Sequence, residues 1–106
     1  MDIKFIREKI KKQEYDLSSH AHRGRQEEQI TIAEIEQVLL LGDIIEKYPK
    51  DERGESCLIA AKVDNKPLHV VCGKRDKKLL VVTVYRPKSP TWKNYKQRIK
   101  ELKSRV

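Results

Sequence analysis

The segment LLVVTVYRP at residues 79–87 is the longest unbroken run of β-forming residues in this chain of 106 residues. A strand with one buried face alternates apolar and polar side chains, but this run is apolar at both even and odd positions until Tyr85. We therefore expect a central strand that is covered on both faces and flanked by other strands. Because the run ends in Tyr85 and Arg86 before Pro87, the strand should carry these two polar side chains to the rim of the sheet.

Three further segments are expected to be strands, at residues 43–48, 57–63 and 68–72. The polar turns between successive strands are too short for parallel crossovers. The sheet should therefore be antiparallel, with about four strands.

The turn at residues 64–67 decides which side chains of the two strands around it are neighbours. With Asn65 and Lys66 as the two loop residues, Lys62 lies opposite His69 among small and apolar side chains. Such a pair is a candidate floor for catalysis or phosphate binding, or else a partly exposed polar pair on a solvent face.

Apolar spacing and capping residues predict the helices. They are expected at residues 2–14, 20–29, 32–41 and 91–105. Ser18 and Ser19 are candidate N-caps of the second helix, and Thr31 with Glu34 forms a capping-box pattern at the start of the third. We therefore expect one α+β domain over residues 1–106, with N-terminal helices, the antiparallel sheet and a closing basic amphipathic helix.

The net charge of +8 is unevenly distributed along the chain. Residues 86–106 hold eight basic side chains and one acidic one, whereas the first 85 residues are close to neutral. Such a basic end suits a polyanion, which is a nucleic acid, an acidic protein surface or a membrane face, unless it is only a solvated helix face. Charges stand where a signal peptide has its apolar core, and no apolar run approaches the roughly 20 residues that span a bilayer. We expect a soluble cytoplasmic protein without a membrane partner.

The chain shows no motif for a metal, a cofactor or a common nucleophile. In the register expected for the hairpin, Cys57 and Cys72 are offset diagonally, which disfavours a disulfide and suggests reduced, buried thiols. His20 and His22 are too close in sequence to share one helix face. We therefore expect neither a metal site nor a cofactor.

What remains is a set of His, Lys, Arg and Tyr residues with few acidic neighbours, which suits metal-independent cleavage of RNA. In that reaction the 2′-hydroxyl attacks the adjacent phosphate while one group removes its proton and another protonates the leaving 5′-oxygen. His20 and His69 can divide these proton transfers, because imidazole titrates near neutral pH. Arg86 can hold the scissile phosphate, and Tyr85 can donate a proton or stack on a base. Each also has a structural explanation, such as a surface position at a helix start for His20 or a surface salt bridge for Arg86.

Several motifs follow one another in an order that resembles a known family. They are YDLSSHA at residues 15–21, ITI at 30–32, GDIIE at 42–46, YP at 48–49, KPLHVV at 66–71 and VTVYRP at 82–87, ending in Trp92. Together they resemble a bacterial and archaeal family of domains of unknown function, family 4258, which is grouped with RelE-like toxins and related RNases. The chain departs from the family pattern near Gly24 and Gln29, where relatives commonly have an Arg and a Gly. Arg23 or Arg25 would take the place of that Arg.

The resemblance covers about residues 15–92 and implies a RelE-like fold and an RNase toxin of a type II toxin–antitoxin pair. The expected partners are RNA and a cognate antitoxin, since such genes often lie beside one for a small antitoxin-like protein with a zinc-finger segment. The family pattern includes His20, His69, Tyr85, Arg86 and Trp92.

RNA contacts are expected from a set of basic side chains on the surface. They are Lys62, Arg23, Arg25, Lys93, Lys96 and Lys100. The alternative is a non-catalytic module that uses the same basic surface to bind nucleic acid or an acidic partner protein.

Overall fold

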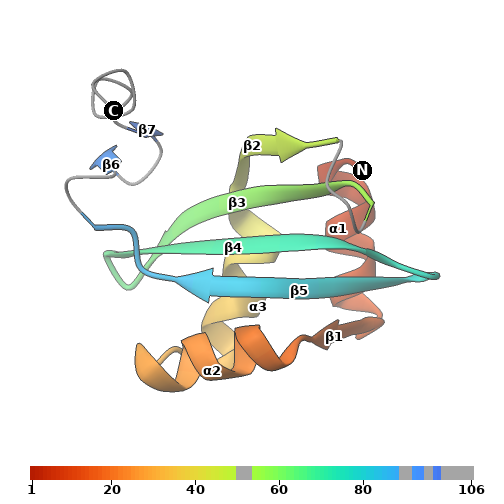
Figure 1. Ribbon diagram of the computed structural model, residues 1–106, viewed down its shortest axis with the longest axis horizontal. Coiled ribbons are helices and arrows are strands. Elements are labelled where there is room, and N and C mark those ends of the chain that lie inside the picture. The colour runs from red at the N-terminus through yellow and green to blue at the C-terminus, as the bar shows by residue number, and fades with distance from the viewer. Residues whose placement is uncertain (50–53, 89–91, 95–96, 99–106) are drawn as a thin grey trace.

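The computed structural model describes residues 1–49, 54–88, 92–94 and 97–98 of the chain. In this part, helices α1 (Ile3–Lys11), α2 (Ser19–Glu27) and α3 (Ile32–Leu41) accompany a five-stranded sheet (Figure 1). The strands of the sheet are β1 (Tyr15–Leu17), β2 (Asp43–Tyr48), β3 (Ser56–Val63), β4 (Lys66–Arg75) and β5 (Lys78–Tyr85). The predicted α+β class is confirmed.

The order of the strands across the sheet is β1-β5-β4-β3-β2. Strands β2 to β5 are antiparallel neighbours joined by short turns, as predicted. Strand β1 adds a fifth strand that runs parallel to β5, so the prediction of a purely antiparallel sheet of about four strands is wrong. The parallel pairing is accessible because the connection from β1 to β5 contains two helices and three strands, far more than a parallel crossover needs.

A β-bulge interrupts the pairing of β4 with β5 at Val82. Val81 and Thr83 pair with Cys72 and Val71, which are consecutive on β4, so Val82 has no partner in the ladder. A bulge inserts one extra residue into a strand and thereby reverses which side of the sheet the following residues face.

The bulge explains why the run at residues 79–87 is apolar at both even and odd positions. Leu79 and Val81 are buried before the bulge, and Val84 is buried after it. Leu80 remains partly exposed, so the run is not covered on both faces. The middle strand of the sheet is β4, and β5 lies between β4 and β1. The prediction that other strands flank this run is therefore confirmed, and the prediction that both of its faces are buried is wrong.

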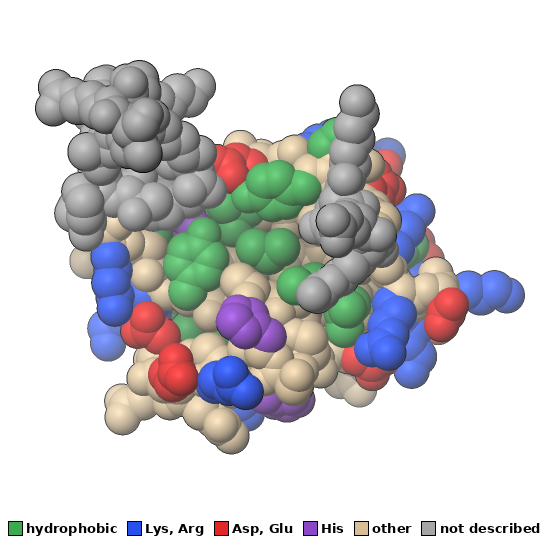
Figure 2. All heavy atoms as spheres, in the orientation of Figure 1, with side chains coloured by type: hydrophobic (Ala, Val, Ile, Leu, Met, Phe, Trp, Pro, Cys, Tyr) green, Lys and Arg blue, Asp and Glu red, His purple; other side chains and the backbone are tan. Residues whose placement is uncertain are grey.

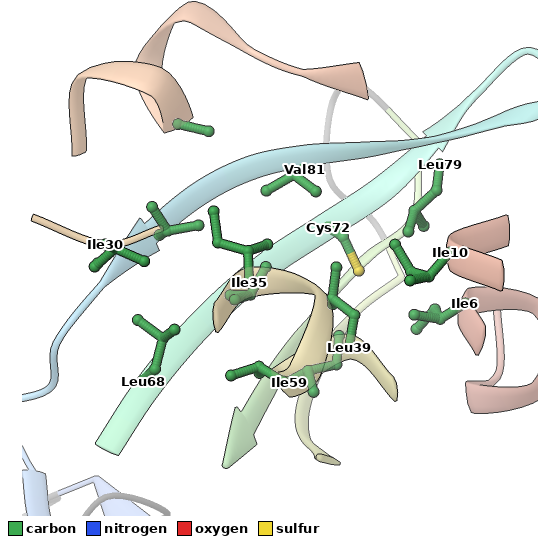
Figure 3. Close-up of a cluster of buried hydrophobic side chains, with 14 of the residues drawn as sticks. Ile6, Ile10, Ile30, Ile35, Leu39, Ile59, Leu68, Cys72, Leu79 and Val81 are labelled. Carbon is green, nitrogen blue, oxygen red and sulfur yellow. The ribbon is translucent and has the colours of Figure 1, made fainter. Parts of the chain in front are cut away.

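Helices α1 and α3 cover one face of the sheet and close the hydrophobic core (Figure 3). The helices contribute Ile6, Ile10, Ile35 and Leu39, all at most 3% exposed. The strands contribute Ile59, Leu68, Cys72, Leu79 and Val81. Because full burial of one Leu or Ile is worth about 1.5–3 kcal/mol, this face supplies most of the apolar stabilisation.

Helix α2 lies along the edge of β5 beyond the point where β1 ends (Figure 1). A Cβ atom on Gly24 would lie 2.6 Å from the carbonyl oxygen of Val84, so glycine is needed for α2 to pack this close to the strand. Ser18 is the N-cap of α2, as predicted. The predicted capping box of Thr31 and Glu34 is also present, at the start of α3.

The hairpin between β3 and β4 has a different register from the predicted one. Its loop residues are Asp64 and Asn65, with φ angles of 52° and 66°. A two-residue type I′ loop needs positive φ at both positions, and Asp and Asn accept this conformation better than the Lys of the predicted pair. His69 therefore lies opposite Ala60 and not opposite Lys62.

The same register places Cys57 directly opposite Cys72, so the predicted diagonal offset is wrong. Both thiols are buried and free, and their Sγ atoms lie 4.0 Å apart. The hydrogen bond between them lowers the pKa of Cys57 and raises the pKa of Cys72. The pair packs as two small apolar side chains in the core.

Strands β6 (Trp92–Asn94) and β7 (Gln97–Arg98) form a separate antiparallel pair where the sequence pattern predicts a helix over residues 91–105. The prediction of a helix is therefore wrong for these residues, and the other residues of the predicted helix lie outside the described part of the chain. Lys93, Lys96 and Lys100 recur at helical spacing, so a helix would gather like charges along one face, which destabilises it.

Candidate active site on the open sheet face

None of the described helices covers the face of the sheet opposite α1 and α3, which we call the open face. Its side chains include Tyr48 of β2, Leu58, Ala60 and Lys62 of β3, His69 and Val71 of β4, and Leu80, Thr83 and Tyr85 of β5, and Gly73 of β4 also lies on this face. Helices α1 and α3 lie behind the sheet in the view of Figure 1, so the same view in Figure 2 looks onto the open face. Hydrophobic side chains gather at its centre (Figure 2).

His69 and Tyr85 face each other across β4 and β5 on the open face. Nδ1 of His69 lies 3.1 Å from the Tyr85 hydroxyl oxygen, and the rings meet edge to face with centroids 5.2 Å apart. His69 is 0% exposed, whereas Tyr85 is partly exposed. The structure thus brings together two of the predicted catalytic residues, with Tyr85 as the member that reaches the surface.

Arg86 extends to the other side of the sheet. Its Nη2 lies 3.3 Å from Oε2 of Glu34 on α3, and its Nη1 donates to the carbonyl oxygen of Pro67 at 3.2 Å. Hydrogen bonding to the backbone of Thr31, together with Arg86, lowers the pKa of Glu34. Arg86, the third catalytic candidate of this region, therefore does not join His69 and Tyr85 on the open face.

Helix α2 brings His20, His22 and Arg23 to the surface, where all three are exposed. Figure 2 shows histidine and basic side chains over α2, beside the hydrophobic centre of the open face. Arg25 is partly buried, and its Nη1 donates to the carbonyl oxygen of Ile30 at 3.4 Å, which ties the end of α2 to the next segment. Within the described part of the chain no hydrogen bond joins α2 directly to the His69–Tyr85 pair.

The remaining predicted RNA contacts are only partly described. Lys62 is exposed on β3, opposite Pro67 and one row beyond Ala60 and His69 on the open face. Lys93 belongs to β6, and its side chain is outside the described part. Lys96 and Lys100 lie outside the described residues altogether.

A groove of about 770 Å³ occupies the other end of the open face, near the β4–β5 turn. It is lined by Ser18, Ser19, Gly54, Glu55, Ser56, Gly73, Lys74, Arg75, Leu80 and Val82. No sequence motif marks this groove, because it depends on the bulge at Val82 and on the missing side chain of Gly73. The Ser18-Ser19 pair is the sequence signal closest to the groove, because it predicts where α2 begins.

Among the residues that the structure describes, no three His, Cys, Asp or Glu side chains are close enough together to hold a metal ion. The described helices are all too short or too polar to cross a membrane.

The fold and the site define a small α+β domain with one helix-covered face and one open face that carries a His–Tyr pair. Residues 17–86 match a family described as a domain of unknown function, DUF4258, and the chain belongs to this family. No curated protein and no solved structure matches the chain.

Proposed function

We propose that this protein is an RNA-cleaving toxin of a toxin–antitoxin pair and that the open face binds the RNA. The observation that carries the proposal is the Tyr85 hydroxyl held 3.1 Å from Nδ1 of His69 on the face that none of the described helices covers. Exposed histidine and arginine side chains of α2 border the same face, which adds proton-transfer groups and positive charge beside the pair.

The chemistry is metal-independent attack of a 2′-hydroxyl on the adjacent phosphate. With the imidazole hydrogen on Nδ1, His69 donates a hydrogen bond to the Tyr85 oxygen and directs the Tyr85 O–H toward the RNA, where it protonates the leaving 5′-oxygen. Because His69 is fully buried, Tyr85 contacts the RNA and His69 acts as a positioning residue. His20 on α2 removes the proton of the attacking 2′-hydroxyl, and each such proton-transfer group typically contributes about 10²–10⁴-fold to a rate.

Phosphate binding falls to exposed basic side chains, because Arg86 is already held by Glu34 and by the backbone of Pro67. Arg23 on α2 and Lys62 on β3 are exposed on either side of the His69–Tyr85 pair. The basic residues of positions 86–106 add a sequence-independent attraction for the RNA backbone, which should weaken steeply as salt is added.

The test is an RNA-cleavage assay that compares the wild type with Tyr85→Phe, which removes only the hydroxyl. Tyr48→Phe is the matched control, because Tyr48 also lies on the open face and its hydroxyl is bonded to Glu46. We expect cleavage to fall about 10²-fold or more in Tyr85→Phe and to stay near the wild-type rate in Tyr48→Phe. Intact RNA with the wild-type protein, or full activity in Tyr85→Phe, would overturn the proposal.

A second candidate function is a non-catalytic module that binds nucleic acid or an acidic partner through the same face. The complete burial of His69 and the ion pair of Arg86 favour it, because both residues then serve the fold. Growth arrest and RNA loss on expression, relieved by Tyr85→Phe or by a co-expressed neighbouring antitoxin, would favour the toxin. RNA binding without any cleavage would favour the module.

A further inference from the structure

The groove at the β4–β5 end of the open face has the volume of a site for a small ligand. Its volume of about 770 Å³ lies within the range of ligand pockets, roughly 300–1,000 Å³. Leu80, Val82 and Gly73 give it an apolar floor, since Leu80 and Val82 are partly exposed and Gly73 adds no side chain. A Cβ at Gly73 would approach the carbonyl oxygen of Glu55 to 3.2 Å, so a side chain there would crowd the groove.

Among the described charged side chains that line the groove, Arg75 is the cation available to a ligand. Glu55 is paired with the N-terminal ammonium of Met1 at 2.5 Å and lies 3.9 Å from Nζ of Lys74. Lys74 also stands over the ring of Phe5, with 4.8 Å between Nζ and the ring centroid. Arg75 is exposed and has no ion-pair partner in the described part of the chain. Its guanidinium is therefore the group available to an anion.

We propose that this groove binds one nucleotide of an RNA strand, a statement that rests on the RNA function proposed above. The base packs on the apolar floor of Leu80 and Val82, because contact with these side chains removes apolar surface of the base from water. The phosphate pairs with Arg75, whose planar fork matches phosphate oxygens. The exposed hydroxyl of Ser19 faces the same groove and hydrogen-bonds the ribose.

The groove nucleotide is not the one cleaved at Tyr85. Gly73 in the groove and His69 in the pair are four residues apart on β4, which is roughly 13 Å along an extended strand. Both lie on the open face, so a strand of RNA bound in the groove continues toward Tyr85. The groove then holds a nucleotide that flanks the scissile phosphate, and the substrate must be longer than a dinucleotide.

The first test measures binding of a single-stranded oligoribonucleotide to the full chain at low salt. Arg75→Gln should weaken binding about tenfold or more, because it removes a charged hydrogen-bonding partner of phosphate. Lys4→Gln is the matched control, since Lys4 is also exposed but lies on α1, on the covered side of the sheet. Leu80→Glu, which places a carboxylate on the floor, should weaken binding by a similar factor. Circular dichroism verifies that each variant is folded.

The second test follows the amide signals of Gly73 and Ser19 by NMR while uridine or adenosine 5′-monophosphate is added. We expect both signals to shift in the wild type and to move little in Arg75→Gln. Equal shifts with inorganic phosphate alone would overturn the nucleotide site in favour of a simple anion site. Displacement of the nucleotide by an acidic peptide at equal concentration would overturn it in favour of a protein-docking surface.

The two proposals fail in different ways. Unchanged RNA binding and cleavage in Arg75→Gln and Leu80→Glu would contradict the proposed nucleotide site in the groove but not the proposed RNase function. If nucleotides shift the signals of Gly73 and Ser19 but the protein neither binds nor cleaves RNA, the proposed RNase function is contradicted and the groove is a site for free nucleotides.

Discussion

The side chain of Ser18 joins helix α2 to the bulge of β5 at Val82. Its Oγ donates a hydrogen bond to the carbonyl oxygen of Val82 at 2.7 Å and accepts one from the N–H of Ala21 at 3.0 Å. One hydroxyl thus caps the helix and holds the strand residue that has left the ladder. The link also places the first turn of α2 beside the groove of the open face.

Replacing Ser18 by Ala should lower the free energy of unfolding by about 2 kcal/mol. Loss of the helix cap costs about 1 kcal/mol, and the unmade bond to Val82 costs about another 1 kcal/mol. Urea denaturation followed by circular dichroism measures the change. Ser19→Ala, which removes an exposed hydroxyl one residue later, should change stability by less than about 0.5 kcal/mol. Equal losses in the two variants would argue against the double role of Ser18.

Gln29 is a site where glycine should stabilise the protein. It follows α2 with a φ of 56°, a left-handed conformation that costs a residue with a side chain about 1 kcal/mol or more. Gln29→Gly should therefore raise the free energy of unfolding by up to about 1 kcal/mol. Gln26→Gly is the control, because glycine at this exposed position inside the same helix should lower the free energy of unfolding by about 1 kcal/mol. A loss of stability in both variants would contradict the prediction.

The features that the sequence predicts correctly are local ones. Ser18 as a helix cap, and Thr31 with Glu34 as a capping box, depend on hydrogen bonds between residues three apart. Such bonds form wherever the helix forms, and the surrounding fold does not alter them. The antiparallel pairing of β2 to β5 follows in the same way from the shortness of the turns.

The geometry of the site could not be predicted, because it depends on features without a sequence signature. The bulge at Val82 reverses the faces of β5, which brings Tyr85 onto the open face beside His69 and directs Arg86 toward α3. The choice of Asp64 rather than Lys66 for the hairpin loop shifts the partner of His69 by two residues. In each case one backbone position decides which side chains meet.

Tyr15 should make stability depend on pH in the alkaline range. Its hydroxyl donates to Oε2 of Glu36 at 2.5 Å, and burial, reinforced by this bond, raises the pKa of Tyr15 from 10.0 to about 12. The unfolded chain loses the Tyr15 proton near pH 10, while the folded chain keeps it until about pH 12. The contribution of the protonated Tyr15 hydroxyl to the free energy of unfolding is therefore complete below pH 10 and is lost as the pH rises toward 12.

The measurement compares urea midpoints of the wild type and Tyr15→Phe across this pH range. Other groups titrate there in both proteins, so the prediction concerns the difference between them. The wild type should be the more stable protein below pH 10, and the difference should shrink between pH 10 and 12. A constant difference over the whole range would show that the Tyr15 hydroxyl does not keep its proton in the fold.

The ion pair of Arg86 with Glu34 should stabilise the protein and decide the role of Arg86. Both side chains are mostly buried, with 21% and 18% exposed, so Arg86→Gln should cost about 1–2 kcal/mol near neutral pH. The pKa of Glu34 is lowered by its hydrogen bond to the Thr31 backbone and by Arg86, so its stabilisation is present above the ordinary value of 4.5 and is lost as the pH falls below it. Glu34→Gln should therefore weaken the loss of stability in acid.

The cleavage assay then separates the two roles of Arg86. If Arg86 serves only the fold, RNA cleavage by Arg86→Gln should stay within about twofold of the wild type at a temperature where the variant remains folded, because Arg86 then makes no interaction in the transition state. If Arg86 binds the scissile phosphate, Arg86→Gln should lower the cleavage rate about tenfold or more, as expected for the loss of a charged hydrogen bond. Glu34→Gln removes the ion-pair partner of Arg86 and makes its guanidinium available to the RNA. Unchanged cleavage in both variants would show that the ion pair only stabilises the fold, and phosphate binding would then be assigned to Arg23 and Lys62.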